Sequence, residues 1–168
     1  DWSSDVCSSD LSNDGGLASQ ATLNFPDATL VDHQGRILIA DQVNYRIRRI
    51  DPATGKISTI AGTGAAESTG DGKLATEAGI FHPRQMALDS AGNLYVAEWL
   101  GSRIRNISAA DGKISTVVGT GTGGFNGDGL PGPQTQINNK VEINQNEWRI
   151  RNSHCLNFGI YLFNYTKW

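Results

Sequence analysis

The chain has 168 residues, of which 38% are hydrophobic and 18% charged, and its formal net charge is −3 with a pI near 5.5. These values are typical of a soluble globular protein, and the lack of a basic run or a positive net charge argues against nucleic acid as a partner. Twenty glycines and few long helix-forming side chains favour short strands joined by turns, so we expect an all-β fold. No apolar stretch approaches the roughly 20 residues of a membrane-spanning helix, so no membrane span is expected.

The first segment, residues 1–11, has no counterpart elsewhere in the chain. It resembles the translation of a common short-read sequencing adapter along all eleven positions, and we interpret it as derived from one. A genuine serine-rich linker is the alternative, but it would explain only the composition. Cys7 lies in this segment and Cys155, the other cysteine, lies in a C-terminal segment that also departs from the rest, so no disulfide is predicted.

A gapless repeat follows, and its period is the interval from Asp14 to Asp71. Its clearest mark is the pair Asp14-Gly15, which recurs as Asp71-Gly72 and as Asp128-Gly129. Further pairs with the same spacing are Pro26 and Pro83, Gly35 and Gly92, Arg46 and Arg103, and Gly62 and Gly119. We therefore divide this region into a first unit at 12–69, a second unit at 70–126 and the opening of a third unit at 127–138.

Each unit holds four short runs of strand-forming residues. They are residues 28–32, 36–41, 45–51 and 56–61 in the first unit, and residues 85–89, 93–98, 102–108 and 113–118 in the second. Turn-forming residues separate the runs, as at 32–35 and 89–92, where Asp stands first and Gly fourth in a tight turn. Each unit is therefore predicted to be a four-stranded antiparallel meander.

The second run of each unit, 36–41 or 93–98, is apolar on successive residues, which indicates that both faces of that strand are covered. The later runs are more polar. This gradient is expected of radially stacked propeller blades, in which neighbouring blades cover the inner strands. The length of the repeat fits a blade with one long loop, here residues 62–82. We predict a partial β-propeller with two four-stranded antiparallel blades and the start of a third.

With the units in register, the second one resembles the NHL-repeat family. The residues that carry the resemblance are Gly70-Asp71-Gly72, Ala75, Ala78, Ile80, Pro83, Ala87, Asp89, Gly92-Asn93-Leu94-Tyr95-Val96-Ala97-Glu98 and Arg103-Ile104-Arg105. The resemblance covers residues 12–138 and implies a β-propeller, usually of roughly six blades, that serves as a binding platform. Three positions depart from the family pattern: Glu98 replaces Asp, Gly101 replaces Asn and Arg36 replaces Asn. These departures are expected to weaken individual contacts without changing the fold.

Successive loops of a meander alternate between its two ends. The loops at 42–44 and 99–101 should therefore share a face with the long loops at 62–82 and from 119 onward, whereas the opposite face should carry only tight turns. We expect ligand binding on this long-loop face. The candidate ligand contacts are Gln42, Asn44, Tyr45, Glu98, Trp99 and Ser102. The rings of Tyr45 and Trp99 are suited to a peptide or a sugar, although simple packing is the competing interpretation of Trp99.

Two charged patterns recur in the units. Arg46 follows Asp41 by five residues and Arg103 follows Glu98 by five, so cross-strand ion pairs Asp41–Arg46 and Glu98–Arg103 are predicted. Asp71 and Asp128, each inside a Gly-Asp-Gly loop, are weak candidates for a calcium site. One carboxylate per loop favours a structural turn instead, so we expect no metal and no cofactor.

The sequence shows no His-x-x-x-His, paired-carboxylate or nucleophile motif, and His33, His82 and His154 are scattered. The predicted function is therefore a non-enzymatic platform that binds a protein, peptide or glycan. The alternative, implied by the resemblance, is a fragment of a propeller enzyme similar to amidating lyases or lactonases, whose metal ligands come from several blades. By analogy alone, the parent protein is expected to be secreted, periplasmic or bound to the cell surface.

The repeat register ends after Asn138, because Lys140 stands where Pro26 and Pro83 set the expectation. Residues 139–168 contain no Ala, Asp or Pro and are rich in residues with AT-rich codons. We interpret this segment as foreign, produced by a frameshift, a retained intron or a chimaeric join. A divergent genuine tail is the alternative.

Overall fold

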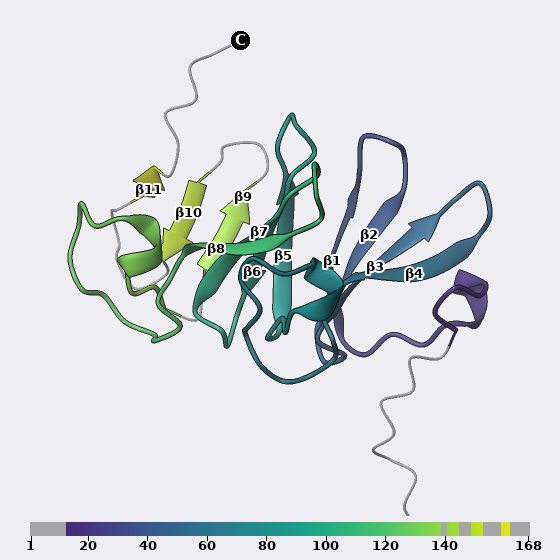
Figure 1. Cartoon of the computed structure of the whole chain (residues 1–168), viewed down its shortest axis with the longest axis horizontal. Helices are drawn as coiled ribbons and strands as arrows, with labels where there is room; N and C mark the ends of the chain where they lie inside the picture. Colours follow the sequence, from purple (N-terminus) through teal and green to yellow (C-terminus); the bar gives the residue numbers. More distant parts are fainter. Residues whose placement is uncertain (1–12, 139–140, 145–148, 153–158, 162–168) are drawn as a thin grey trace, which may run out of the picture.

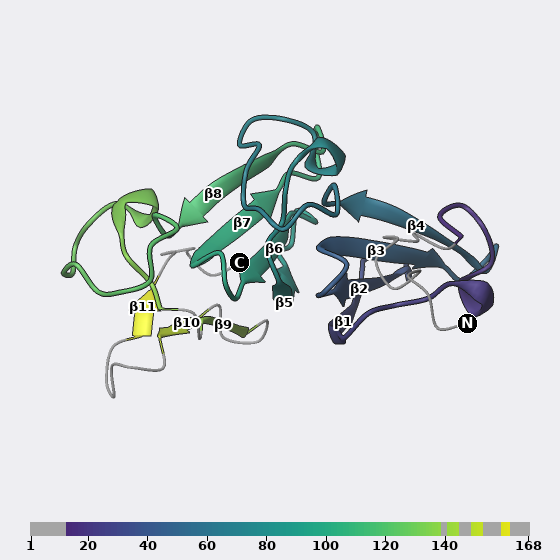
Figure 2. The same ribbon diagram turned by 90° about the horizontal axis from the view of Figure 1, so that it is seen from below.

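The computed structural model describes residues 13–138, 141–144, 149–152 and 159–161. Within these residues the chain forms three antiparallel sheets that stand side by side, as Figures 1 and 2 show. The predictions for residues 1–11, Cys7, His154 and Cys155 lie outside the described residues. None of the helices in the part of the chain that the structure describes is long and apolar enough to cross a membrane.

The first two sheets are four-stranded meanders with neighbouring strands in sequence order. The first consists of β1 (Pro26–Val31), β2 (Ile37–Asp41), β3 (Arg46–Asp51) and β4 (Lys56–Ala61). The second consists of β5 (Pro83–Leu88), β6 (Leu94–Glu98), β7 (Arg103–Ile107) and β8 (Ile114–Val118). A three-stranded sheet of β9 (Val141–Asn144), β10 (Arg149–Asn152) and β11 (Gly159–Tyr161) follows. Three short 3-10 helices, η1 (Ala18–Gln20), η2 (Ala75–Glu77) and η3 (Gly132–Gln134), lie in the loops before the sheets.

All eight strands expected in the two units are present, and the chain is part of a β-propeller. The main difference is at the first strand of each blade, which begins two residues earlier than expected, at Pro26 and at Pro83. Proline is tolerated at the first position of a strand, and an irregularity in the pairing follows each proline at once. The strand therefore starts before the regular hydrogen-bonded ladder does.

The blades pack radially through their first strands. β5 contacts both β1 and β9. In Figure 2 these three strands lie along one side of the molecule, while the outer strands β4 and β8 diverge on the other side. Val141, the first residue of β9, is the repeat equivalent of Arg84 in β5, so β9 occupies the inner position of a third blade. β9 thus continues the arrangement of the sheets, and the foreign origin of the sequence at 139–168 stays a prediction.

Burial follows from this arrangement. The second strands are buried on nearly every residue, as the apolar runs predicted. β1 and β5 differ although they are repeat equivalents: β1 is mostly exposed, whereas β5 is mostly buried. The reason is that β5 lies between β1 and β9, whereas β1 has an inner strand, β5, on one side only within the described residues.

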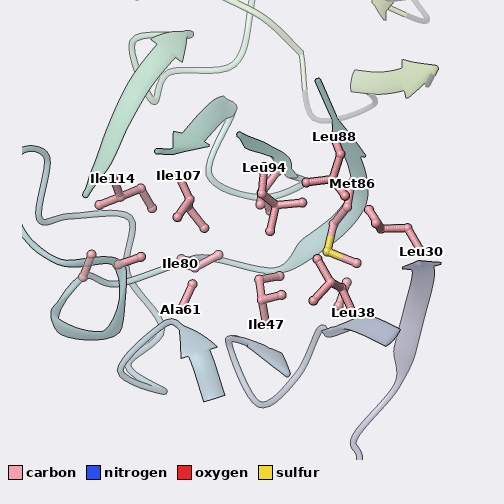
Figure 3. Packing of buried hydrophobic residues seen from close by; sticks show 14 residues of the cluster. Leu30, Leu38, Ile47, Ala61, Ile80, Met86, Leu88, Leu94, Ile107 and Ile114 are labelled. Carbon is pink, nitrogen blue, oxygen red and sulfur yellow. The ribbon is translucent and has the colours of Figure 1, made fainter. Parts of the chain in front are cut away.

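The principal core fills the interface between the two blades. Figure 3 shows Leu38 and Ile47 of the first blade pointing toward Met86 and Leu94 of the second. The long loop contributes to the same core, because Ile80 is fully buried between the two sheets. A smaller cluster on the far side of the second blade joins Ile104, Val118 and Ile137 to Ile143 of β9.

The long loop at 62–82 does more than connect two blades. It leaves the first blade with backbone hydrogen bonds from Gly62 N to Ala75 O and from Thr63 N to Ala78 O. Its middle part extends the outer edge of the second blade, since Gly72 N donates to Ile114 O at 2.8 Å and Ile114 N donates to Lys73 O at 3.0 Å. Only the beginning and the end of this loop therefore belong to the long-loop face.

Candidate functional site

The long-loop face is formed where the β2–β3 loop, the β6–β7 loop and the end of the long loop meet. Tyr45 and Ser102 end the two hairpin loops with φ of 54° and 45°, and His82 precedes β5 with φ of 49°. Left-handed backbone is uncommon for residues with a side chain and is concentrated at functional and tightly constrained loops. Two of these three residues, Tyr45 and His82, belong to one cluster of rings.

Four rings form a continuous row across the boundary between the blades; we call Tyr45, Phe81, His82 and Trp99 the aromatic row. The centroid of Tyr45 is 5.8 Å from that of Phe81 and 5.0 Å from that of His82, and the latter pair meets edge to face. His82 is 6.2 Å from Trp99, again edge to face. These are the geometries that aromatic quadrupoles favour, so the rings hold one another in place.

The row is only partly covered by the rest of the protein. All four side chains are half-buried, so each still presents some surface to solvent. Burial lowers the pKa of His82, so its imidazole is neutral near pH 7. The surface is therefore aromatic and uncharged along most of its length.

A charged pair anchors one end of the row. The Arg84 guanidinium carbon lies 5.0 Å from the centroid of the Trp99 ring, and Arg84 Nε donates to Asp27 Oδ2 at 2.6 Å. Asp27 and Arg84 are repeat equivalents on β1 and β5, so the pair joins two inner strands. Cation–π contact and ion pair together fix the orientation of the Trp99 ring.

The remaining predicted contact residues divide into two groups. Gln42 and Asn44 are half-buried in the β2–β3 loop, where Asn44 Nδ2 donates to Asp41 Oδ2 at 2.8 Å. Glu98 and Ser102, with 1% and 2% exposure, are buried. Their candidacy as ligand contacts on this face is therefore corrected: strand alternation turns Glu98 into the interface between the blades.

Glu98 belongs to a buried network around Arg105. Arg105 Nη1 lies 3.2 Å from Glu98 Oε1, and Nη2 lies 2.7 Å from Asp71 Oδ1 and 3.0 Å from Thr69 O. Ser68 Oγ donates a hydrogen bond to Glu98 Oε2. The network thus ties the long loop to the middle of the second blade.

The structure corrects the predicted ion pairs. Asp41 and Arg46 are cross-strand neighbours, but the ion pair of Asp41 is with Arg48, at 3.6 Å, and Arg48 also lies 3.3 Å from Asp14. Arg46 donates instead to Thr63 O at 2.6 Å and to Asn44 O at 3.2 Å. Because both arginines of Arg-Ile-Arg lie on one strand face, sequence spacing could not choose between them.

The second blade shows the same exchange of partners. Glu98 pairs with Arg105, two residues beyond Arg103. Arg103 donates to Thr120 O at 3.1 Å and to Ser68 O at 3.3 Å. Arg46 and Arg103 therefore anchor the starts of the long loops, and Arg48 and Arg105 hold the buried carboxylates.

Burial raises the pKa of Glu98 to about 7, and the nearby Arg105 guanidinium and the Ser68 hydroxyl partly oppose this shift. The carboxylate of Asp71, one of the two weak metal candidates, forms an ion pair with Arg105. Asp128, the other, is exposed, and the repeat equivalent of Arg105 in its unit is Leu162, outside the described residues. Within the described ranges, no group of three or more His, Cys, Asp or Glu side chains is placed to hold a metal ion.

Glu98 and Gly101 differ from their repeat equivalents Asp41 and Asn44, and the two differences compensate each other. A Cβ on Gly101 would lie 2.9 Å from Glu98 Cβ and 2.5 Å from Glu98 Oε2, so the glutamate fills the space of a side chain at position 101. In the first blade that space is filled by Asn44, which donates to the shorter Asp41. The pair Asp–Asn of one blade is therefore replaced by the pair Glu–Gly in the other.

This exchange predicts a strong coupling between the two positions. Glu98→Asp alone should lower the unfolding free energy by about 1–3 kcal/mol, because the carboxylate withdraws from Arg105 and Ser68. Gly101→Asn alone should also destabilise, because Glu98 occupies the space. The double variant should recover at least about 1 kcal/mol of the summed losses in a denaturant-based double-mutant cycle. Additive losses would contradict the compensation.

No family model matches the sequence. The chain is similar to the protein SUPPRESSOR OF QUENCHING 1, chloroplastic, of Arabidopsis thaliana, with 33% identity over 103 residues, which is 61% of this chain and 10% of that protein. It is also similar to Teneurin-1 of Mus musculus, with 34% identity over 104 residues, 55% of this chain and 4% of that protein. The chain thus spans a tenth or less of either relative's length.

Solved structures share the fold over most of the described residues. A protein of unknown function from Bacteroides thetaiotaomicron matches with a TM-score of 0.61 and 21% identity over 73% of this chain and 31% of that chain. An auxiliary nutrient binding protein from the same organism matches with a TM-score of 0.55 and 19% identity, over 73% of this chain and 33% of that chain. The chain spans about a third of these structures, and the likeness supports the β-propeller architecture.

Sequence reasoning found two members of the aromatic row, Tyr45 and Trp99, and missed Phe81, His82 and the supporting Arg84. The three missed residues precede or begin β5, where the sequence shows only a proline and a strand start. A signal did exist, because the end of the long loop was expected on the same face as Tyr45 and Trp99. Which rings would touch depended on how the blades pack.

Proposed function

We propose that the chain is part of an NHL-repeat propeller whose long-loop face binds a peptide or a glycan without catalysing a reaction. The order and spacing of the repeat motifs in residues 12–138 support the family, and the aromatic row supports the binding function. Peptides and sugars both offer C–H-rich surfaces between polar groups, and such surfaces pack well on half-exposed rings.

The observation that carries the proposal is the continuity of the row across two blades. Tyr45 comes from the first blade and Trp99 from the second, and Phe81 and His82 fill the space between them. An extended ligand could therefore contact both blades at once. Arg84 and Asp27 stand at the Trp99 end, where they add polar partners to an otherwise aromatic surface.

Trp99→Ala should reduce binding at least roughly tenfold, because ring anchors dominate such surfaces. The probes are printed arrays of soluble oligosaccharides and of short peptides, followed by titration of any feature that the wild-type chain binds. The loss of unfolding free energy should be about 1–2 kcal/mol, since the ring is half-buried and contacts His82 and Arg84.

Two controls separate the row from general stickiness. Trp99→Phe keeps a ring and should retain most of the binding, and Phe125→Ala removes an aromatic side chain that is 59% exposed outside the row. Binding that survives both Trp99→Ala and Tyr45→Ala would overturn the proposal. The proposal would also be overturned if the wild-type chain bound no feature in the oligosaccharide array and none in the peptide array.

A further inference from the structure

A groove of about 530 Å³ opens on the face opposite the aromatic row, between the two blades. We call it the turn-face groove, because its rim is formed by the tight turns around 32–36, 89–93 and 108–112. The sequence predicted only tight turns on this face, so the groove is a finding of the structure. Its volume falls in the range of about 300–1,000 Å³ that is usual for small-molecule sites.

Part of the wall of the groove is apolar. Leu38 from the first blade and Leu94 and Ile107 from the second line it, and all three are part of the buried core. The turns of the two blades approach closely above them: His33 Nδ1 lies 4.0 Å from the position of a Cβ on Gly92. The groove is thus bounded by both blades, and its lining combines an apolar patch with polar side chains.

One cation in the groove has no protein counter-charge. Arg49 is a cross-strand neighbour of Leu38, so both side chains lie on the strand face that lines the groove. Arg49 is half-buried, and its side chain forms no ion pair or hydrogen bond to another residue in the part of the chain that the structure describes. A guanidinium in this setting favours a carboxylate, because it offers two parallel donors in a partly desolvated site.

The other charges leave this cation uncompensated. Asp32, the acidic residue that lines the groove, is engaged by Arg36, whose Nε lies 2.6 Å from Asp32 Oδ2. Asp51 lies in an adjoining depression together with Arg49, and its Oδ1 accepts a hydrogen bond from Ala53 N at 2.9 Å. The lining of the groove therefore carries one positive charge in excess.

The repeat shows that the fold does not require this charge. The repeat equivalents of Arg36 and Arg49 in the second blade are Asn93 and Asn106, and both blades form the same meander. Asparagine is thus tolerated at both structural positions. The two arginines distinguish the turn-face groove from the corresponding place in the next blade.

We propose that the turn-face groove binds a small organic carboxylate with an apolar body, with Arg49 pairing with the carboxylate and Leu38, Leu94 and Ile107 contacting the apolar part. This site is separate from the aromatic row. A ligand could therefore occupy the groove whether or not the long-loop face binds a partner.

The test uses hexanoate as the probe and follows the methyl groups of Leu38, Leu94 and Ile107 in the full chain by NMR. Hexanoate should shift these methyl signals saturably with a Kd on the order of millimolar, and hexanol should not saturate them in the same range. Arg49→Asn should raise the Kd for hexanoate roughly fivefold or more. Lys73→Asn, which removes an exposed cation from the long loop, should leave it unchanged.

Arg49→Asn uses the residue of the next blade, and unchanged amide signals away from the groove verify its fold. Arg49→Gln provides a second variant with the same expected loss. The proposal is overturned if hexanol binds as well as hexanoate, if both Arg49 variants keep the wild-type Kd, or if hexanoate produces no saturable shift.

Discussion

Replacing Arg105 by leucine is expected to lower the unfolding free energy by about 3–5 kcal/mol. The guanidinium is 1% exposed and lies within 3.2 Å of Glu98 and 2.7 Å of Asp71. Its loss leaves Glu98 buried without its cation and releases the long loop from the second blade. Removing one partner of a buried pair is more costly than removing both, because the remaining carboxyl must either stay charged without its cation or take up a proton.

Chemical denaturation followed by circular dichroism measures this effect. Lys113→Ala is the matched control, because its ion pair with Asp111 is 3.7 Å long and exposed, so its removal should leave the unfolding free energy nearly unchanged. Arg105→Leu combined with Glu98→Leu should be less destabilised than Arg105→Leu alone. A loss below about 1 kcal/mol for Arg105→Leu would refute the buried-pair account.

Gly62→Ala is expected to cost about 3 kcal/mol or more, because two unfavourable effects coincide there. The residue has φ of 94°, where a side chain is strained. An added Cβ would also meet Tyr45 O and lie 2.9 Å from Arg46 Cα, and these backbone atoms cannot rotate away. The change therefore pushes apart the start of the long loop and the loop that carries Tyr45.

Gly35→Ala isolates the backbone contribution. Gly35 has φ of 77° in a tight turn, and an added Cβ there would meet nothing within 4 Å, so the expected cost is about 1 kcal/mol. Thermal or denaturant unfolding of both variants gives the difference directly. Equal losses at the two positions would show that the close approach at Gly62 is relieved by a small backbone shift.

The two predictions share a physical origin in the long loop. Gly62 fixes where the loop leaves the first blade, and Arg105 holds its middle part against the second blade. Ile80, near the end of the loop, is buried in the core between the blades. These three residues lie outside the aromatic row and outside the lining of the turn-face groove. They nevertheless help to set how one blade is placed against the next, and therefore the shape of both sites.

Local and periodic signals in the amino-acid sequence specify the strands, the turns and the repeat. Apolar runs, Asp-to-Gly turns and the regular spacing of the units are local or periodic signals, and they predicted all eight strands of the two blades with ends that differ little from those observed. They also placed Tyr45 and Trp99 on one face, because loops of a meander alternate between its ends.

The partners that side chains find across the blades depend on how the two sheets pack. The choice of Arg105 over Arg103 for Glu98 depends on a distant part of the long loop, which brings Ser68 and Asp71 to the same carboxylate network. The contact of Tyr45 with His82 likewise forms between two blades, and the groove lined by Arg49 and Ile107 lies between them. Such contacts depend on the packing angle and separation of two sheets, and strand periodicity constrains neither of them.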